Sequence, residues 1–242
     1  MAQSKTARVV TTRDLGSARL IEFAPAEPLD FVGGQYLIIN SGLTLPDGKL
    51  AKRAYSIASP DCEQARFTLF VRRIGEGLAS NWLHLRAVGD EIPFSGPWGK
   101  FLPDDRTPRR ATWIVATDTA ITAALGLVNG APFAPQIDHA SLHWLVESDH
   151  YFLPPVEVAA RLPRGLRTFS RSTIPWVGHP ERLGAASAHL ADCLRTEVPV
   201  SVFLAGDGAV IYPLRQQLIA AGVLDSNIRL EPFFNNPAKK SQ

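Results

Sequence analysis

The sequence predicts two domains of different architecture: an all-β antiparallel barrel in residues 1–104, followed by an α/β domain with a parallel sheet in residues 111–242. In the first part, short strand-like runs alternate with turn residues, whereas in the second, strand-like and helix-like segments alternate. The stretch LPDDRTPRR between them has prolines and charges without periodicity, which is typical of a linker. A chain of 242 residues that is 45% hydrophobic can form two modest cores.

The first domain is expected to contain the strands RVVTT, ARLIEF, QYLIIN, RAYSIA, RFTLFV and DEIPFS. Glycine, proline and aspartate separate these runs, as in consecutive antiparallel strands. The stretch GLASNWLHLRAV differs, because Leu78, Trp82, Leu83 and Leu85 have near-helical spacing. We therefore expect one short helix within the barrel domain.

The second domain is expected to contain the strands ATWIVA, SLHWLV, LRTFS, VSVFLA and NIRLE. The helix-like segments between them include AITAALGLV, VEVAARL, AASAHLADCL and AVIYPLRQQLIAAG. This alternation predicts a parallel sheet flanked by helices, with ligands at the carboxyl ends of the strands. Asp118 and Asp207 each follow such an end.

Composition excludes several classes of protein. The net charge of +2, from 25 basic and 23 acidic residues without long runs of one sign, gives no sign of nucleic-acid binding. The N-terminal residues lack the apolar core of a signal peptide, and no apolar run approaches the roughly 20 residues that cross a bilayer. We therefore expect no membrane association and a cytoplasmic location.

Metal chemistry is also not expected. Cys62 and Cys193 are far apart and form no C-x-x-C motif, so they predict neither a disulfide framework nor a zinc or iron–sulfur site. His139 and His143 are four residues apart, but they fall in a turn that enters a strand, where helical metal-ligand geometry is not expected.

The clearest ligand-binding chemistry lies in KRAYSIAS and GEGLASNWLH. Arg53, Tyr55 and Ser56 offer a guanidinium, an aromatic ring and a hydroxyl from one strand, with Ser56 on the opposite side from the other two. Gly77 precedes a helix start that includes Ser80, where free N–H groups and the helix dipole favour an anion. An arginine and a helix N-terminus together suit a pyrophosphate.

These residues resemble the ferredoxin–NADP reductase family, whose flavin signature is Arg-x-Tyr-Ser followed by Gly-x-x-Ser. Arg53, Tyr55 and Ser56 match the first part, and Gly77 and Ser80 match the second. The stretches GGQY, GDEIPFSGPWGKF and FLAGDGAVIYPLRQQLIAAGV follow the family's order and roughly its spacing. The resemblance covers nearly the whole chain.

The resemblance implies FAD as cofactor and NAD(P)H as substrate. It places Arg53 at the FAD pyrophosphate, Tyr55 against the isoalloxazine or ribityl chain, and Ser56 near the flavin N5. Phe233, with Phe234, resembles the aromatic residue that covers the flavin face in relatives, so Tyr55, Ser56 and Phe233 are the expected catalytic residues. The further cofactor- or nucleotide-binding residues are expected to be Ile57, Gly77, Leu78, Ala79, Ser80, Thr117, Asp118, Thr119, Arg171, Gly206 and Asp207.

The nucleotide loop departs from the family pattern. Relatives carry a Thr-Gly-Thr-Gly-Ile-Ala-Pro-like loop where this chain has TDTAITA, so both glycines and the proline are absent. Added side chains take up the room that glycine leaves for a dinucleotide. We expect Asp118 to cap the helix that begins near Ala120, accepting the N–H groups that a pyrophosphate would use and weakening dinucleotide binding.

Two further positions bear on nucleotide choice. NADP-using relatives often place an arginine for the 2′-phosphate where this chain has LVESDH, with Glu147 and Ser148. Arg171 and Arg182 are candidate substitutes, and surface arginines are the alternative interpretation. Ala205 stands where some relatives have a cysteine near the nicotinamide.

Two functions are therefore considered. The first is an FAD-dependent reductase that takes hydride from NAD(P)H and passes electrons to a separate ferredoxin or flavodoxin. Lys52, Arg72 and Arg73 form a basic group that is a candidate docking site for such an acidic carrier, and a solvated barrel surface is the alternative interpretation. The second is a flavoprotein subunit whose nucleotide domain has lost NAD(P)H binding and serves partner docking or redox sensing, which Asp118 favours.

Overall fold

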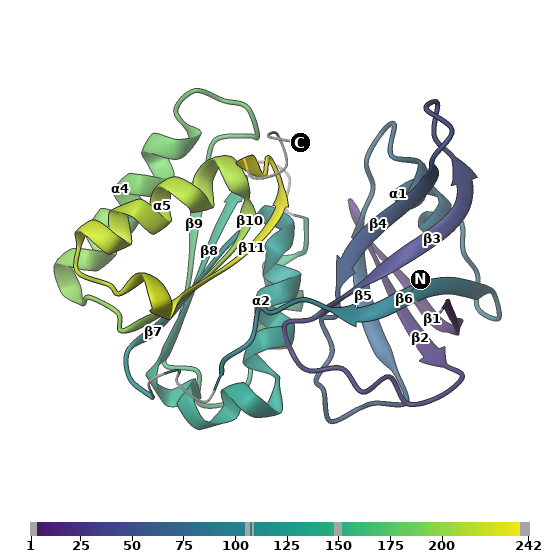
Figure 1. Ribbon diagram of the computed structural model, residues 1–242, viewed down its shortest axis with the longest axis horizontal. Helices are drawn as coiled ribbons and strands as arrows, with labels where there is room; N and C mark the ends of the chain where they lie inside the picture. The colour runs from purple at the N-terminus through teal and green to yellow at the C-terminus, as the bar shows by residue number, and fades with distance from the viewer. Residues whose placement is uncertain (1–3, 105–106, 108, 148–151, 238–242) are drawn as a thin grey trace.

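The computed structural model describes residues 4–104, 107, 109–147 and 152–237, which form an antiparallel and a parallel sheet in two lobes (Figure 1). The antiparallel sheet has the order β4-β3-β6-β1-β2-β5. Its strands are β1 (Lys5–Leu15), β2 (Ala18–Pro25), β3 (Tyr36–Thr44), β4 (Leu50–Ser56), β5 (Phe67–Arg72) and β6 (Glu91–Trp98). The expected short helix is α1 (Leu78–His84), which packs against β3, β4 and β5.

The antiparallel sheet is barrel-like. Its edge strands β4 and β5 form no ladder with each other in the described part of the chain, although the N–H of Ala58 donates to the Thr68 carbonyl at 3.0 Å just beyond β4. Stacked Phe23 and Phe67 lie 4.9 Å apart in its core, and Phe94 meets Phe67 edge-on at 5.7 Å. Alternation of buried and less buried residues along β3 explains why one face of the sheet can cover this core.

The parallel sheet has the order β11-β10-β7-β8-β9, as the alternating segments predict. Its strands are β7 (Thr112–Thr117), β8 (Ala140–Glu147), β9 (Thr168–Ile174), β10 (Ser201–Asp207) and β11 (Ile228–Phe234). The helices are α2 (Ile121–Val128), α3 (Pro155–Ala159), α4 (Arg182–Thr196) and α5 (Gly208–Ala220), with 3₁₀ turns η1 (Asp118–Ala120), η2 (Ala131–His139) and η3 (Asp225–Asn227). β7 and β10 are buried at every position, as central parallel strands must be when helices cover both faces.

The strand order defines where a ligand can bind. From β7 the chain adds β8 and β9 on one side and later β10 and β11 on the other, so the direction reverses between β7 and β10. α2 covers the face toward the antiparallel sheet, and α4 and α5 cover the opposite face (Figure 1). Open sheets of this kind bind ligands outside the carboxyl ends of the strands at such a reversal.

Both predicted domain limits, 104 and 111, fall between β6 and β7. The exact residues at which the two domains end and begin stay a prediction. Within the described ranges, none of the helices has the length and apolar character needed to cross a membrane.

A glycine contact joins the two domains. α2 is buried along its whole length, and its Gly126 lies against the chain at Gly33 and Ile57 of the first domain. A Cβ on Gly33 would overlap the Gly126 carbonyl oxygen, and a Cβ on Gly126 would overlap the Ile57 carbonyl oxygen. The domains therefore meet backbone to backbone, which only glycine permits here.

The carboxylate of Asp61 stabilises the same contact between the two domains. Its Oδ2 accepts the Gly33 N–H at 3.0 Å, and its Oδ1 accepts the Ala131 N–H at 2.9 Å. Gly33 belongs to the first domain and Ala131 begins η2 of the second, so one side chain holds backbone groups of both. Charge-assisted hydrogen bonds of this kind are stronger than neutral ones.

We expect Gly126→Ala to lower the free energy of unfolding by about 1–3 kcal/mol, because the added methyl forces the domains apart or distorts α2. Gly184→Ala is the matched control: Gly184 lies in α4, and a Cβ there would meet nothing within 4 Å. That change should be neutral or stabilising by up to about 1 kcal/mol, since alanine favours the helix. Urea unfolding measures both, and equal effects of the two changes would contradict the close approach.

Candidate active site

The end of β4 carries the residues expected to bind flavin. Arg53 is exposed, Tyr55 is half-buried against the core of the first domain, and Ser56 and Ile57 are buried. Burial raises the pKa of Tyr55 to about 12, and nearby Arg53 opposes that rise. The phenol therefore keeps its proton near neutral pH, and it can pack or donate a hydrogen bond without carrying charge.

Helix α1 lies beside this strand, because it packs on β3 and β4. Gly77 is the N-cap in an extended conformation, and no side chain caps the helix. Ser80 is buried, and its hydroxyl donates to the Gly77 carbonyl at 3.0 Å. The groups that α1 presents to an anion are therefore the N–H groups of Leu78 and Ala79, and not the Ser80 hydroxyl.

The Arg53 guanidinium is also suited to bind an anion. Nη1 donates to the Lys52 carbonyl at 2.9 Å, and no carboxylate pairs with the Arg53 side chain in the part of the chain that the structure describes. An exposed guanidinium with unused donors and an uncapped helix start suit the pyrophosphate of FAD. These residues thus fit the cofactor that the sequence motif implies.

Thr117, Gly206 and Asp207 meet at the reversal between β7 and β10, as the sequence predicts. Gly206 has φ +124°, and a Cβ on it would overlap the Thr117 Oγ1. The Asp207 N–H donates to that oxygen at 2.8 Å. Asp207 also caps α5, because its Oδ1 accepts the Ala209 N–H at 3.0 Å.

The predicted role of Asp118 as a helix cap is wrong. Its Oδ1 accepts the Glu147 N–H at 3.1 Å, and its Oδ2 accepts a hydrogen bond from Arg182 Nη2, whereas no side chain caps η1 or α2. Asp118 has φ +47°, the left-handed conformation that glycine adopts easily and that aspartate tolerates. The family's glycine is replaced, but the backbone keeps a conformation suited to glycine, and a buried guanidinium takes the carboxylate.

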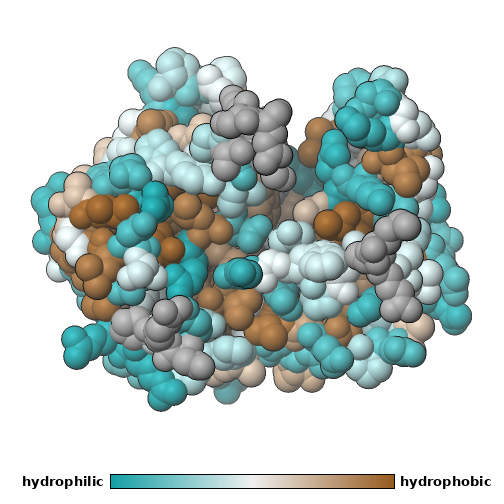
Figure 2. Space-filling view, in the orientation of Figure 1, coloured by the Kyte–Doolittle hydropathy of each residue, from teal (hydrophilic) through white to brown (hydrophobic). Residues whose placement is uncertain are grey.

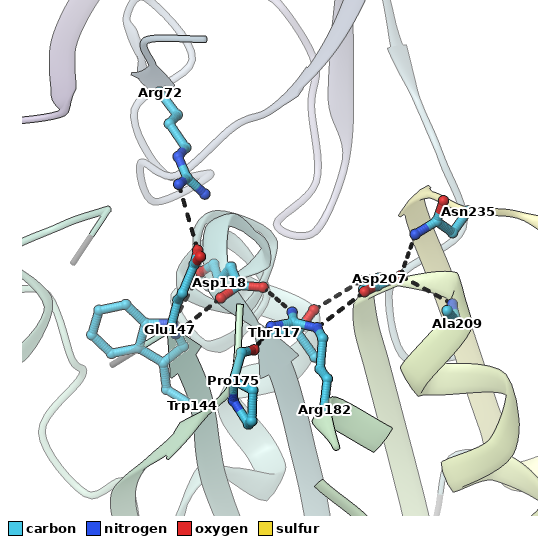
Figure 3. Close-up of polar contacts among 10 residues, drawn as sticks. All are labelled: Arg72, Thr117, Asp118, Trp144, Glu147, Pro175, Arg182, Asp207, Ala209 and Asn235. Carbon is cyan, nitrogen blue, oxygen red and sulfur yellow. Dashed lines mark hydrogen bonds and ion pairs between the residues drawn. The ribbon is translucent and has the colours of Figure 1, made fainter. Parts of the chain in front are cut away.

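Arg182 therefore joins two strand ends inside the protein (Figure 3). Besides Asp118 it binds Asp207, with Nε 3.1 Å from Oδ2, and its Nη1 donates to the Pro175 carbonyl at 2.5 Å. The Arg182 side chain is 4% exposed, so it cannot serve as a surface contact for a 2′-phosphate. Burial raises the pKa of Asp118, and the Arg182 charge opposes that rise.

Two other sequence-based predictions concern this region. Arg171 is exposed on β9 and pairs in register with Trp144, and its role in nucleotide binding stays a prediction. Glu147 ends β8 and forms an ion pair with Arg72 of the first domain at 3.5 Å, and Ser148 lies outside the described residues. Arg72 is therefore engaged between the domains, and its part in carrier docking stays a prediction.

The end of β11 approaches the flavin strands. Phe233 and Phe234 are 37% and 36% exposed, so they are not packed beneath the last helix. Burial and the charge of Glu231 on β11 raise the pKa of Tyr36, and Tyr36 pairs with Ser56. This strand end thus lies near the first domain's candidate residues, although a role for Phe233 over the flavin stays a prediction.

The charge cluster leads to a prediction. We expect Arg182→Met to lower the free energy of unfolding by about 3–5 kcal/mol, because it leaves two buried carboxylates without their cation. The loss should shrink as the pH falls, since the unpaired carboxyl groups then take up protons in the folded state. Urea unfolding across a pH series measures both effects.

Arg195→Met is the matched control on the same helix. Arg195 pairs with Asp192 in the exposed ion pair of α4, where the two side chains are 73% and 64% exposed. Its loss should change the free energy of unfolding by no more than about 0.5 kcal/mol. A small effect of Arg182→Met, without pH dependence, would contradict the buried cluster.

Comparison with known proteins identifies the family of this chain. Residues 7–102 match the family model of the oxidoreductase FAD-binding domain. Ferredoxin–NADP reductase B of Sorangium cellulosum is 32% identical over 205 residues, which are 80% of this chain and 80% of the relative. The ferredoxin reductase component of a 3-ketosteroid-9-alpha-monooxygenase from Mycolicibacterium smegmatis is 26% identical over 86% of this chain, but the match spans only 57% of that relative.

A solved structure has the same fold as this chain. The crystal structure of a cytochrome P450 reductase from Amycolatopsis superposes with a TM-score of 0.75 over 96% of this chain and 70% of that one, at 23% identity. The two-sheet architecture is thus shared even where the sequences have diverged. Given the 32% identity over four-fifths of both chains, this chain belongs to the ferredoxin–NADP reductase family of FAD-dependent oxidoreductases.

Proposed function

We propose that the protein transfers electrons from NAD(P)H to a separate carrier protein of the ferredoxin or flavodoxin type. The observation that supports this best is the placement of two half-sites: the uncapped α1 start with Arg53 in one domain, and the β7–β10 reversal in the other. Figure 2 shows a notch between the two lobes at the top of the view, and in Figure 1 β11 of the second domain ends beside it. A cytoplasmic location is part of this proposal.

In the first domain, Arg53 and the N–H groups of Leu78 and Ala79 would neutralise the FAD pyrophosphate. Tyr55 would pack against the flavin, and Ser56, with Ile57 beside it, would lie at its reactive edge. FAD, when bound, supplies the conversion of a two-electron hydride donor into one-electron transfers.

In the second domain, Thr117, Thr119 and Gly206 would border the dinucleotide. Asp118 does not place a free anion in that site, because Arg182 and the Glu147 N–H bind its carboxylate. The ion pair also keeps the carboxylate away from the start of η1, which no side chain caps, whereas the Ile121 N–H at the start of α2 already donates to the Asp118 carbonyl. A carboxylate held by Arg182 therefore opposes nucleotide binding less than a carboxylate that caps the helix would.

We expect Arg53→Ala to weaken FAD binding about ten- to a hundredfold, since one charge-assisted contact to the pyrophosphate is lost. The protein should stay folded, because Arg53 is exposed. FAD retained after gel filtration, with circular dichroism as the check on folding, measures this. Arg8→Ala is the control: Arg8 lies on β1 of the same sheet, and its ion pair with Glu91 is exposed and 3.9 Å long. Stoichiometric FAD in Arg53→Ala would refute the assignment.

A second experiment tests the direction of electron flow. The FAD-loaded protein is mixed anaerobically with NADH or NADPH, and flavin absorbance is followed before a ferredoxin or flavodoxin is added. We expect rapid bleaching by at least one nucleotide, and carrier reduction that slows as salt is added, because surface attraction is screened beyond about 8 Å at physiological ionic strength. Flavin that neither nucleotide bleaches would refute the reductase and favour the docking subunit.

Lys52 and Arg73 are the basic residues left for carrier docking, since Arg72 is paired. Lys52→Glu with Arg73→Glu should slow carrier reduction at low salt while leaving flavin bleaching by the nucleotide unchanged. Arg195→Glu, on exposed α4, is the matched charge change away from β4 and β5. If both variants slow carrier reduction equally, docking does not use this surface.

A further inference from the structure

Three side chains of metal-binding type converge between the parallel sheet and α4. They are His143 on β8, and His189 and Cys193 on α4. One ligand atom from each lies within 4.8 Å of the others. The Cys193 sulfur is 3.6 Å from His189 Nε2 and 3.9 Å from His143 Nδ1.

The fold brings these residues together from two elements. His189 and Cys193 are four residues apart, so they share one face of α4. His143 faces the same helix, because it alternates along β8 with Trp144, which packs on the α2 side. The cluster thus lies on the side of the sheet opposite the interface with the first domain.

The separations suit a tetrahedral metal ion. Zinc bound at about 2.3 Å to sulfur and 2.0–2.1 Å to nitrogen holds these ligands about 3.6 Å apart. The two sulfur–nitrogen distances, 3.6 and 3.9 Å, are close to that value before any metal draws the ligands inward. We propose that His143, His189 and Cys193 form a zinc site with a fourth position for water or the neighbouring Ser170 hydroxyl.

Hydrogen bonds around the cluster support this assignment. The Ser172 hydroxyl lies 3.0 Å from His189 Nδ1, so Nδ1–H can donate to it while Nε2 keeps its lone pair toward Cys193. Metal-bound histidines usually have such a partner on their second nitrogen. The Ser170 hydroxyl lies 2.9 Å from His143 Nδ1, at the edge of the same space.

The state of His143 also suits a ligand. His143 is 8% exposed, and its Nδ1 lies 3.9 Å from the Cys193 sulfur. Its Nε2 has no hydrogen-bond partner within the described residues, whereas its Nδ1 faces Cys193 and is the nitrogen that would bind the metal. His189 and Cys193 are only partly buried, which leaves a path from solvent.

Binding would convert the thiol of Cys193 to a thiolate, with its proton released to solvent and a Zn–S bond formed. No oxidant is needed. A redox role for the same cysteine is less well supported, because burial raises its pKa and Cys62 is the only other cysteine of the chain. Zinc would tie α4 to β8 and so fix the helix whose first residue is Arg182.

The experiment uses the FAD-loaded full chain, stripped of metal with a chelator and then titrated with Zn²⁺ or Co²⁺. We expect one ion per chain at micromolar affinity or tighter, and cobalt absorption bands of a tetrahedral thiolate complex at longer wavelength than the flavin bands. Flavin content, measured on the same samples, should not change. Loss of flavin binding would therefore count against the proposed function and not against the zinc site.

Cys193→Ala and His189→Ala should each abolish the cobalt bands and weaken zinc binding at least a hundredfold. Ser172→Ala should weaken it about ten- to a hundredfold, as expected for the partner of a ligand. Cys62→Ala, a change at an exposed cysteine, and His139→Ala should leave binding unchanged. The proposal fails if the unaltered chain gives no cobalt thiolate bands, or if Cys193→Ala binds zinc as tightly as the unaltered chain.

Discussion

The backbone contact between Gly33 and Gly126 sets the geometry on which the rest of the protein depends. A flavin held by the first domain and a nucleotide held by the second can exchange a hydride only if the two domains keep a fixed separation. Here that separation is defined by main chain against main chain, with α2 wholly buried and Asp61 bound to both sides. Side chains at the site can vary while this spacing is preserved.

The nucleotide loop illustrates such variation. Losing a glycine with a left-handed backbone normally costs free energy, and placing a carboxylate there also buries a charge. Contacts around Asp118 offset both the backbone strain and the cost of the buried charge. Aspartate tolerates the backbone, the Trp144 indole donates to the Asp118 carbonyl at 2.9 Å, and Arg182 neutralises the carboxylate. In this loop, Asp118 keeps the left-handed backbone that glycine adopts easily, and the ion pair with Arg182 stabilises its carboxylate.

Local patterns in the sequence sufficed to predict the two sheets and the helices between the parallel strands, and they also supplied the flavin-binding hypothesis. Arg53, Tyr55 and Ser56 lie on one strand, and Gly77 begins one helix, so their chemistry is visible in short stretches. The partner of Asp118 was not visible in this way, because Arg182 is 64 residues away and follows another strand. The prediction instead assigned Asp118 to the nearest free N–H groups, although a buried guanidinium is the stronger partner. His143 and Cys193, 50 residues apart, meet for the same reason, through tertiary packing.

The bridge made by Asp61 also limits how a substrate can enter. Because Asp61 ties Gly33 to Ala131, a hinge that swung the two domains apart would break charge-assisted bonds and expose the apolar faces of α2. Access to the notch must then come from smaller movements at its rim. The end of β11 lies at this rim: Phe233 and Phe234 are exposed, and the next residues are held by hydrogen bonds from Asn235 to Asp207 at 3.0 Å and from Tyr212 to Asn236 at 3.1 Å. We therefore expect a substrate to displace the end of β11 and to leave the contact between the two domains unchanged.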